Sequence, residues 1–178
     1  MPNWCQGTLR IRGPKKNVMK FLNECFEVND VRFRDDQGQL MPVRSMMEGV
    51  KTEDINVGSW VPVHLNGNGE YIYVAGTKRA FIEWDPVIGM YQNGMVVYHY
   101  EDNMTMMVIL PVKQAWSFHD EDWIEISKNY EIDLHLFGWE CGMEFAQELE
   151  IQNGKVMKDE TCEYSDWLWE SPCPFVGG

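Results

Sequence analysis

Residues 7–27 read GTLRIRGPKKNVMKFLNECFE, and this stretch decides the class of fold. Leu9 and Ile11 alternate with polar neighbours, which is the period of a strand that buries one face. The period then changes, and apolar residues recur three and four positions apart over 14–27, as in an amphipathic helix whose first residue is Pro14. The chain therefore opens with a strand that leads directly into a helix.

The later part of the chain predicts a second helix and more strands. The helix is expected to begin in the run HDED at 119–122, with Asp120 as its N-cap and acids over the positive end of the helix dipole. Asn153-Gly154 between two alternating segments predicts a β-hairpin. Its strands are 144–152 and 155–160, and other strands are expected at 71–74, 96–100, 104–110 and 132–136.

This order of elements indicates an α+β protein with a ferredoxin-like split β-α-β sandwich and an added C-terminal β-hairpin. We expect one domain over 1–178, with both helices on one face of the sheet. Residues 28–70 are an irregular insertion, because turn-forming residues separate their short apolar pieces. Residues 161–178 are a C-terminal tail whose aromatic side chains are expected to dock on the body.

The net charge of −13 is concentrated in the last third of the chain. Residues 1–118 carry 13 acids and 12 bases, whereas residues 119–178 carry 15 acids and 3 bases. This excess is either a solvated face or a surface for a partner protein with a basic surface. The residues expected to contact such a partner are Glu144, Glu148 and Glu150 of the hairpin, with Asp120, Glu121 and Asp122 of the helix.

A basic and aromatic group gives the alternative interpretation, a single-stranded nucleic-acid-binding module. A sheet that binds RNA presents aromatic side chains flanked by bases on its open face. The candidates for that face are Lys78, Arg79, Arg10, Arg12 and Tyr73. The net charge disfavours this alternative, since a polyanion is repelled unless a local basic stripe overrides the mean.

The cysteine pattern indicates reduced thiols rather than disulfides or a metal centre. The five cysteines are odd in number and contain no C-x-x-C pair. Cys5 has no base near it in sequence that would activate a thiolate, so we expect it to be buried and structural. Helix capping accounts for His119 and the acids at 120–122 without a metal, so we expect neither metal nor cofactor. No phosphate-binding loop or nucleophile motif is present, so no catalytic residue is assigned.

No export signal and no apolar run of ~20 residues is present in the sequence, so we expect a cytoplasmic protein that does not span a membrane.

Four segments of the chain resemble the YubB-type ferredoxin-like family of plasmid and bacteriophage proteins. Asn3-Trp4-Cys5, with Leu9, Ile11 and Gly13, is similar to the opening N-W-C-x-N-x-L-x-(V/I)-x-G, with Gly7 in place of the second Asn. The second segment is Gly76-Thr77-Lys78, followed by Arg79 where the family has Trp. The third is Ala115-Trp116-Ser117, followed by Phe118-His119 instead of two prolines. The fourth is Trp139-Glu140-x-Gly142-x-x-Phe145, which comes after the strand that follows Tyr130. The resemblance implies the ferredoxin-like fold and a mobile-element origin, and it supplies no catalytic residues. Asn3, Trp4, Cys5, Trp116 and Gly142 are its structural motif residues.

Taken together, charge and resemblance favour a non-enzymatic accessory protein of a phage or other mobile element. We expect it to bind a protein of the bacterial host through its acidic surface, for example as an inhibitor of a host defence system. Single-stranded nucleic acid is the alternative ligand.

Overall fold

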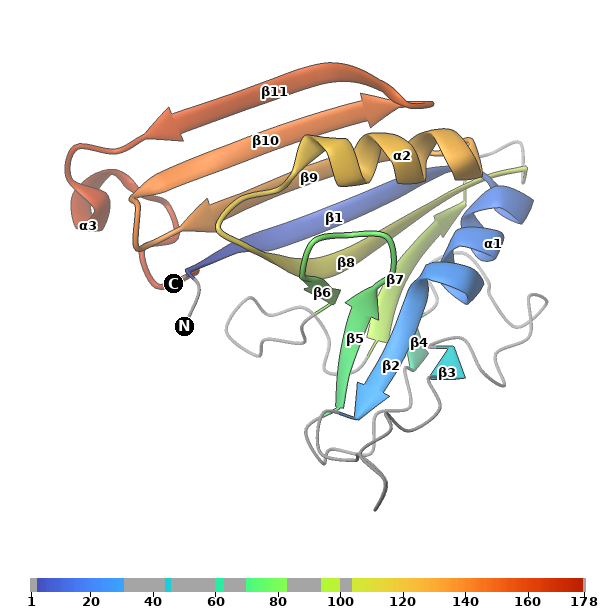
Figure 1. Ribbon diagram of the computed structural model, residues 1–178. Helices are drawn as coiled ribbons and strands as arrows, with labels where there is room; N and C mark the ends of the chain where they lie inside the picture. The colour runs from blue at the N-terminus through green and yellow to red at the C-terminus, as the bar shows by residue number, and fades with distance from the viewer. Residues whose placement is uncertain are drawn as a thin grey trace.

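The opening strand and helix form as their periods predict, and further elements follow them in a computed structural model (Figure 1). The structure describes residues 3–30, 44–45, 60–62, 70–82, 94–99 and 104–177. Its elements are β1 (Trp4–Pro14), α1 (Lys15–Cys25), β2 (Phe26–Asp30), β3 (Arg44–Ser45), β4 (Trp60–Pro62), β5 (Glu70–Val74), β6 (Ala80–Ile82), β7 (Gly94–His99), β8 (Thr105–Ala115), α2 (Asp120–Tyr130), β9 (Asp133–Glu140), β10 (Phe145–Gln152), β11 (Lys155–Glu163) and α3 (Trp167–Glu170).

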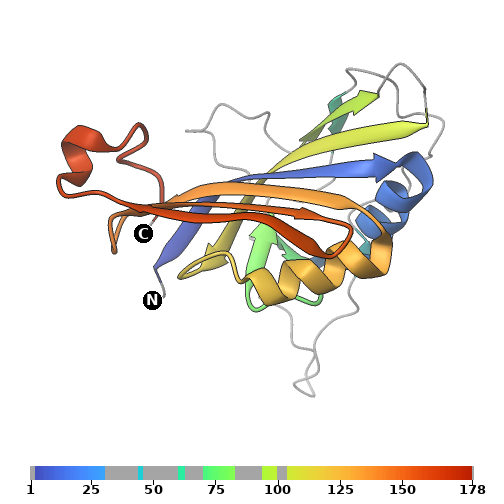
Figure 2. The same ribbon diagram turned by 90° about the horizontal axis from the view of Figure 1, so that it is seen from above.

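The described strands form one antiparallel sheet of 11 strands. Its order is β11-β10-β9-β1-β8-β6-β5-β2-β3, and β7 pairs with β8 and carries β4. Strand β1 therefore lies between β8 and β9, and α2 connects these two flanking strands. Both α1 and α2 lie on one side of the sheet, as Figures 1 and 2 show from two directions. The α+β class is confirmed.

The core fills the space between the sheet and its two long helices. Leu9 and Ile11 of β1 are fully buried, as their alternation predicts. Phe21 of α1 and Trp123 of α2 are also inaccessible to solvent. We call the opposite side of the sheet the open face; it receives the residues that alternate with these buried ones.

The first helix ends earlier than its apolar period predicts. Residue Phe26 leaves the helix in an extended conformation and begins β2, where it pairs with Val74 of β5. Phe26 is fully buried, so packing in the sheet outweighs a further half turn of helix. Pro14 is likewise the N-cap rather than the first helical residue. Apart from residues 28–30 of β2, β3, β4 and Glu70, the predicted insertion at 28–70 lies outside the described residues.

The prediction that Asp120 caps the second helix is wrong. The N-cap is His119, which is extended and makes no side-chain cap bond, and Asp120 is the first helical residue. Asp120, Glu121 and Asp122 nevertheless occupy the first turn, where a negative charge is favourable.

The predicted C-terminal hairpin is confirmed. Strands β10 and β11 pair across Asn153-Gly154, which both have a positive φ. The tail is only partly docked: Trp167 is 4% exposed, whereas Trp169 is 86% exposed. The expectation that all the aromatic side chains of the tail pack on the body is therefore wrong for Trp169 and for Phe175, which is also 86% exposed.

Candidate functional site

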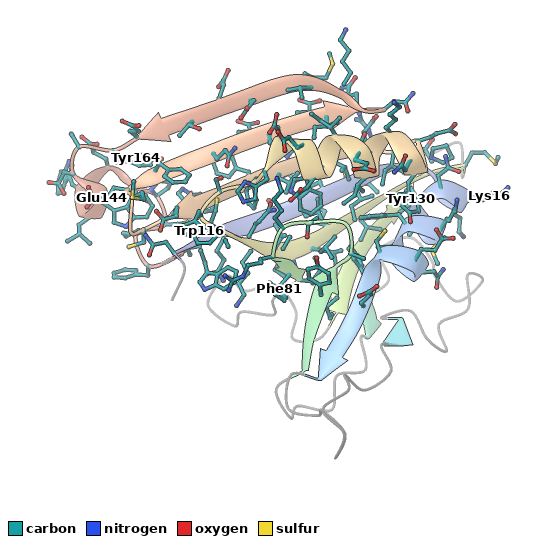
Figure 3. All side chains as sticks on the ribbon, in the orientation of Figure 1. Lys16, Phe81, Trp116, Tyr130, Glu144 and Tyr164 are labelled. Carbon is teal, nitrogen blue, oxygen red and sulfur yellow. The ribbon has the colours of Figure 1, made fainter. Side chains whose placement is uncertain are left out.

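The four segments quoted from the sequence meet at one end of the sheet, where β1 begins and β8 and β9 end. The Trp116 N–H donates to the Asn3 carbonyl oxygen at 2.8 Å, and the Ala115 N–H donates to that of Arg79 at 3.3 Å. A Cβ added at Gly142 would lie 2.2 Å from the Asn3 side-chain nitrogen. In Figure 3, Trp116 and Phe81 are labelled far from Tyr130 and Lys16 at the other end of the molecule.

Two cations and two indole rings alternate at this end, and we call them the cation–aromatic ladder. The Lys113 ammonium lies 5.0 Å from the centre of the Trp4 ring. The Arg79 guanidinium lies 5.6 Å from the centre of the Trp4 ring and 5.8 Å from that of Trp116. These distances are within the range of cation–π attraction. Trp4 also meets Phe81 edge to face at 5.9 Å, so its ring has little freedom to move.

Two members of the ladder, Arg79 and Trp116, have an unusual backbone. Arg79 has φ 61° and Trp116 has φ 68°, a region that costs an L-residue roughly 1–2 kcal/mol. Two hydrogen bonds hold Arg79 there, from its N–H to Thr77 and from Ala115 to its carbonyl oxygen. Because the Trp116 N–H is bonded to Asn3, each residue is fixed from a neighbouring segment. Such outliers concentrate at functional sites.

The buried side chain of Gln114 connects two segments at the same end of the sheet, and no sequence pattern predicted this role. Its side chain is fully buried; the amide donates to the Asp122 carboxylate at 3.0 Å and to the Lys78 carbonyl oxygen at 3.2 Å. Its amide oxygen accepts from the His119 N–H and from the Trp123 indole. Gln114 therefore fixes the turn before β6 against the start of α2. A single glutamine in an apolar strand carries no signal for such a role.

The buried Glu140 closes the turn between β9 and β10. Its carboxylate accepts the Gly142 N–H at 2.8 Å and also the Met143 N–H. Cys5 is completely buried nearby, as expected for a structural cysteine. Burial, and secondly the Glu140 charge, raise the pKa of the Cys5 thiol well above its usual range. The Cys5 thiolate is therefore suppressed, which argues against nucleophilic chemistry at this residue.

A second feature of this end is a group of exposed apolar side chains. We define the tail surface as Met143, Glu144, Leu168, Trp169 and Phe175. The exposed fractions are 68% for Met143, 74% for Leu168 and 86% for both Trp169 and Phe175. The Tyr164 N–H donates to the Glu144 carbonyl oxygen at 2.9 Å, which joins the tail to the turn that carries Met143. Glu144 and Tyr164 are labelled beside each other next to α3 in Figure 3.

The six acids expected to form one contact surface are divided between separate places. Asp122 is 8% exposed, and its carboxylate accepts from the Lys78 N–H at 2.6 Å and from Gln114. Asp120 and Glu121 belong to α2, and Glu121 forms an ion pair with the Lys78 ammonium at 3.2 Å.

Glu148 and Glu150 lie on the open face, because they alternate along β10 with Leu149 and Ile151, which are buried under the helices. Of the six, Glu144 alone belongs to the tail surface.

The basic residues of the alternative interpretation are only partly gathered. Arg10, Arg12 and Tyr73 alternate with buried neighbours and so lie on the open face. Arg12 forms an ion pair with Asp133 at 2.7 Å. Arg79 is part of the ladder, whereas Lys78 is paired with Glu121.

Neither a metal site nor a membrane-spanning helix is found in the part of the chain that the structure describes. There, no group of three or more His, Cys, Asp or Glu side chains is placed to hold a metal ion. Among the same residues, no helix has the length and apolar character needed to cross a membrane.

Comparisons with known proteins found no matching family model, no matching curated protein and no matching solved structure.

Proposed function

We propose that this protein acts by binding another protein, and that the tail surface contacts a partner whose surface is basic and apolar. The observation that carries the proposal is the exposure of Trp169 and Phe175, each 86%, beside the acids of the C-terminal third. Tryptophan and phenylalanine are enriched at protein interfaces, where a few large side chains supply most of the binding energy.

The backbone that carries Leu168 and Trp169 is held in place before any partner arrives. Asp166 caps α3 by accepting the Trp169 N–H at 3.3 Å, and Glu170 accepts from the Ser165 hydroxyl and N–H, each at 3.0 Å. The buried Trp167 anchors the turn through its indole N–H, which donates to Pro174 at 2.9 Å. A preorganised surface loses less entropy on binding.

Charge complements this apolar contact. Glu144, Glu163, Asp166 and Glu170 lie on or next to the tail surface in the chain, and no lysine or arginine occurs after Lys158. Such a field steers a basic partner to the site and disfavours acidic ones. The acidic partner-binding surface is thus proposed around Glu144, not around all six acids.

The biological setting belongs to the same proposal. We propose a ferredoxin-like arrangement, which the position of β1 between β8 and β9 and the connection through α2 support. Together with the YubB-like segments, this favours an accessory protein of a phage or other mobile element in the bacterial cytoplasm. An inhibitor of a host defence protein is the role that an acidic binding surface would serve.

Capture from a bacterial host lysate tests the proposal when matched variants are compared. The test variant is Trp169→Ala with Phe175→Ala, and the control is Val156→Ala with Met157→Ala, which removes exposed apolar groups of β11. We expect a stoichiometric partner with the wild type and the control, and its loss with the test variant. Equal capture by both variants, or no stoichiometric partner, contradicts the proposal.

A further inference from the structure

The cation–aromatic ladder has no part in the proposed protein contact, yet its last ring is open to solvent. Trp116 is 55% exposed although it is a large apolar side chain, and one side of its ring faces Arg79. We propose that the ladder is a binding site for single-stranded nucleic acid. A base stacks on the exposed side of the Trp116 indole, and a neighbouring phosphate contacts the Arg79 guanidinium.

Arg79 is available for a phosphate. It is exposed, and among the residues that the structure describes no carboxylate lies within ion-pair distance of its guanidinium. A guanidinium presents a planar fork of donors that matches phosphate oxygens. The guanidinium can donate to a phosphate while it remains near the two indole rings, so one side chain serves both contacts.

The local charge differs from the average charge of the molecule. Arg79 and Lys113 are within the ladder, whereas Arg10, farther along the open face of β1, lines a pocket that also contains Glu150. The acids nearest in sequence to Trp116 are Asp120 and Glu121, and the Glu121 carboxylate is already paired with Lys78. The two cations of the ladder oppose, at this place, the repulsion expected from a net charge of −13.

The backbone at Trp116 favours a binding role over a purely structural one. A φ of 68° is strained for tryptophan but not for glycine. In this strained conformation the indole is exposed to solvent instead of buried. Any base can stack on this exposed ring, whatever the sequence of the nucleic acid, because every base has an aromatic face. An acidic peptide would also contact Arg79, but it lacks the planar ring that Trp116 would stack.

Fluorescence anisotropy of a labelled oligothymidylate tests the proposal, with the full chain titrated at low salt. We expect binding that weakens as salt increases, with a slope of about −0.7 in log affinity against log salt for each phosphate contacted. Trp116→Ala is expected to weaken binding about 5- to 100-fold, the range of one lost stacking contact. Arg79→Ala should weaken binding and also reduce the salt slope by about 0.7.

Three controls make the result decisive. Trp169→Ala removes the equally prominent indole of the tail surface and should leave the affinity unchanged, which separates this site from the proposed protein contact. Polyglutamate and polyphosphate should bind more weakly than the oligonucleotide, since neither has bases. The proposal is overturned if no oligonucleotide binds at low salt. It is equally overturned if Trp116→Ala binds like the wild type, or if polyphosphate competes as well as the oligonucleotide.

Discussion

The Trp116 N–H lies 2.8 Å from the Asn3 carbonyl oxygen, so the residue after β8 is hydrogen-bonded to the residue before β1. This bond extends the pairing of β1 and β8 beyond Trp4 and Ala115, their last paired residues. It sets the position from which the Trp116 indole reaches Arg79. The same end of β1 is tied to the tail, because the Gly177 N–H donates to the Gln6 side chain at 3.3 Å. The ladder and the tail surface are therefore built on a common end of the sheet.

Close contact between β1 and β9 predicts that Gly7 cannot be replaced. Gly7 lies opposite Gly138, and a Cβ added at Gly7 would be only 1.9 Å from the Phe137 carbonyl oxygen. Neither the added Cβ nor the Phe137 carbonyl oxygen can move away, because each is attached to backbone that is paired in the sheet. Gly7→Ala should therefore destabilise the fold by about 3 kcal/mol. Chemical denaturation measures the change.

Gly142→Ala is the matched control. Its Cβ would meet the end of the Asn3 side chain, which can turn away, and would lie 3.0 Å from the Glu140 carboxylate. We therefore expect a smaller loss than for Gly7→Ala, about 1 kcal/mol. Equal effects of the two substitutions would contradict this account of the β1–β9 contact.

The end of α2 predicts a stabilising substitution. Glu131 follows the helix in the left-handed region, with φ 51° and ψ 51°, and its side chain is exposed. Glu131→Gly should remove this strain and stabilise the fold by about 0.5–1 kcal/mol, or roughly 1–4 °C in Tm.

Glu125→Gly places glycine at an exposed position within the same helix. It should lower stability by about 1 kcal/mol, because glycine is a poor helix former. Thermal unfolding followed by circular dichroism compares the two variants. A lower Tm for Glu131→Gly than for the wild type would show that the side chain has a stabilising contact.

The burial of Cys5 predicts slow reaction with thiol reagents. Burial and the Glu140 charge raise its pKa, so the thiolate is scarce as well as inaccessible. Cys162 is exposed and should be labelled first in the native protein at pH 8. Peptide mapping by mass spectrometry identifies the labelled residue, and Cys5 should react only after unfolding. Rapid native labelling of Cys5 would instead indicate an accessible reactive thiol.

The ion pairs of Glu148 predict how stability changes in acid. Its carboxylate lies 2.8 Å from the Lys158 ammonium and 2.9 Å from the His135 ring nitrogen, and these bonds lower its pKa, Lys158 most. A lowered pKa in the folded state stabilises the fold above the ordinary carboxyl pKa. This contribution is lost as the pH falls through the lowered value.

Glu148→Gln should therefore destabilise the fold at pH 7, by roughly 0.2–1 kcal/mol, and the difference from the wild type should shrink toward pH 3. Urea denaturation at several pH values measures it. Glu144→Gln is the control, since Glu144 forms no ion pair with any described residue. A difference that stays constant with pH would show that the ion pairs of Glu148 contribute nothing.

The parts of the fold that the sequence predicted correctly are those determined by local patterns. Alternation placed Leu9 and Ile11 in the core, and Asn153-Gly154 placed the hairpin, because both depend on neighbours in the chain. Features that depend on long-range pairing were not predicted. The contact of Arg79 with Trp4 needs β8 between β1 and β6, and no local pattern reports that order.

The predicted helix ends were wrong for a related reason, and the six acids predicted to contact a partner lie in separate places. Phe26 leaves α1 because it pairs in β2, and Asp122 in the first turn of α2 accepts a hydrogen bond from Lys78. The helical period predicts neither contact. The six acids share a charge but not a face, since a strand alternates its side chains and a helix rotates them. The exposure of Trp169 was missed because apolar composition favours burial and gives no sign of a binding surface.

The most direct test of the proposed function is hydroxyl-radical footprinting of the free chain and of its captured complex. The account predicts that Met143, Trp169 and Phe175 are oxidised readily in the free chain and protected in the complex. Met157 of β11, 51% exposed, should be oxidised equally in both. Protection of Met157, with Trp169 and Phe175 oxidised as in the free chain, would contradict the assignment of the tail surface as the site of partner binding.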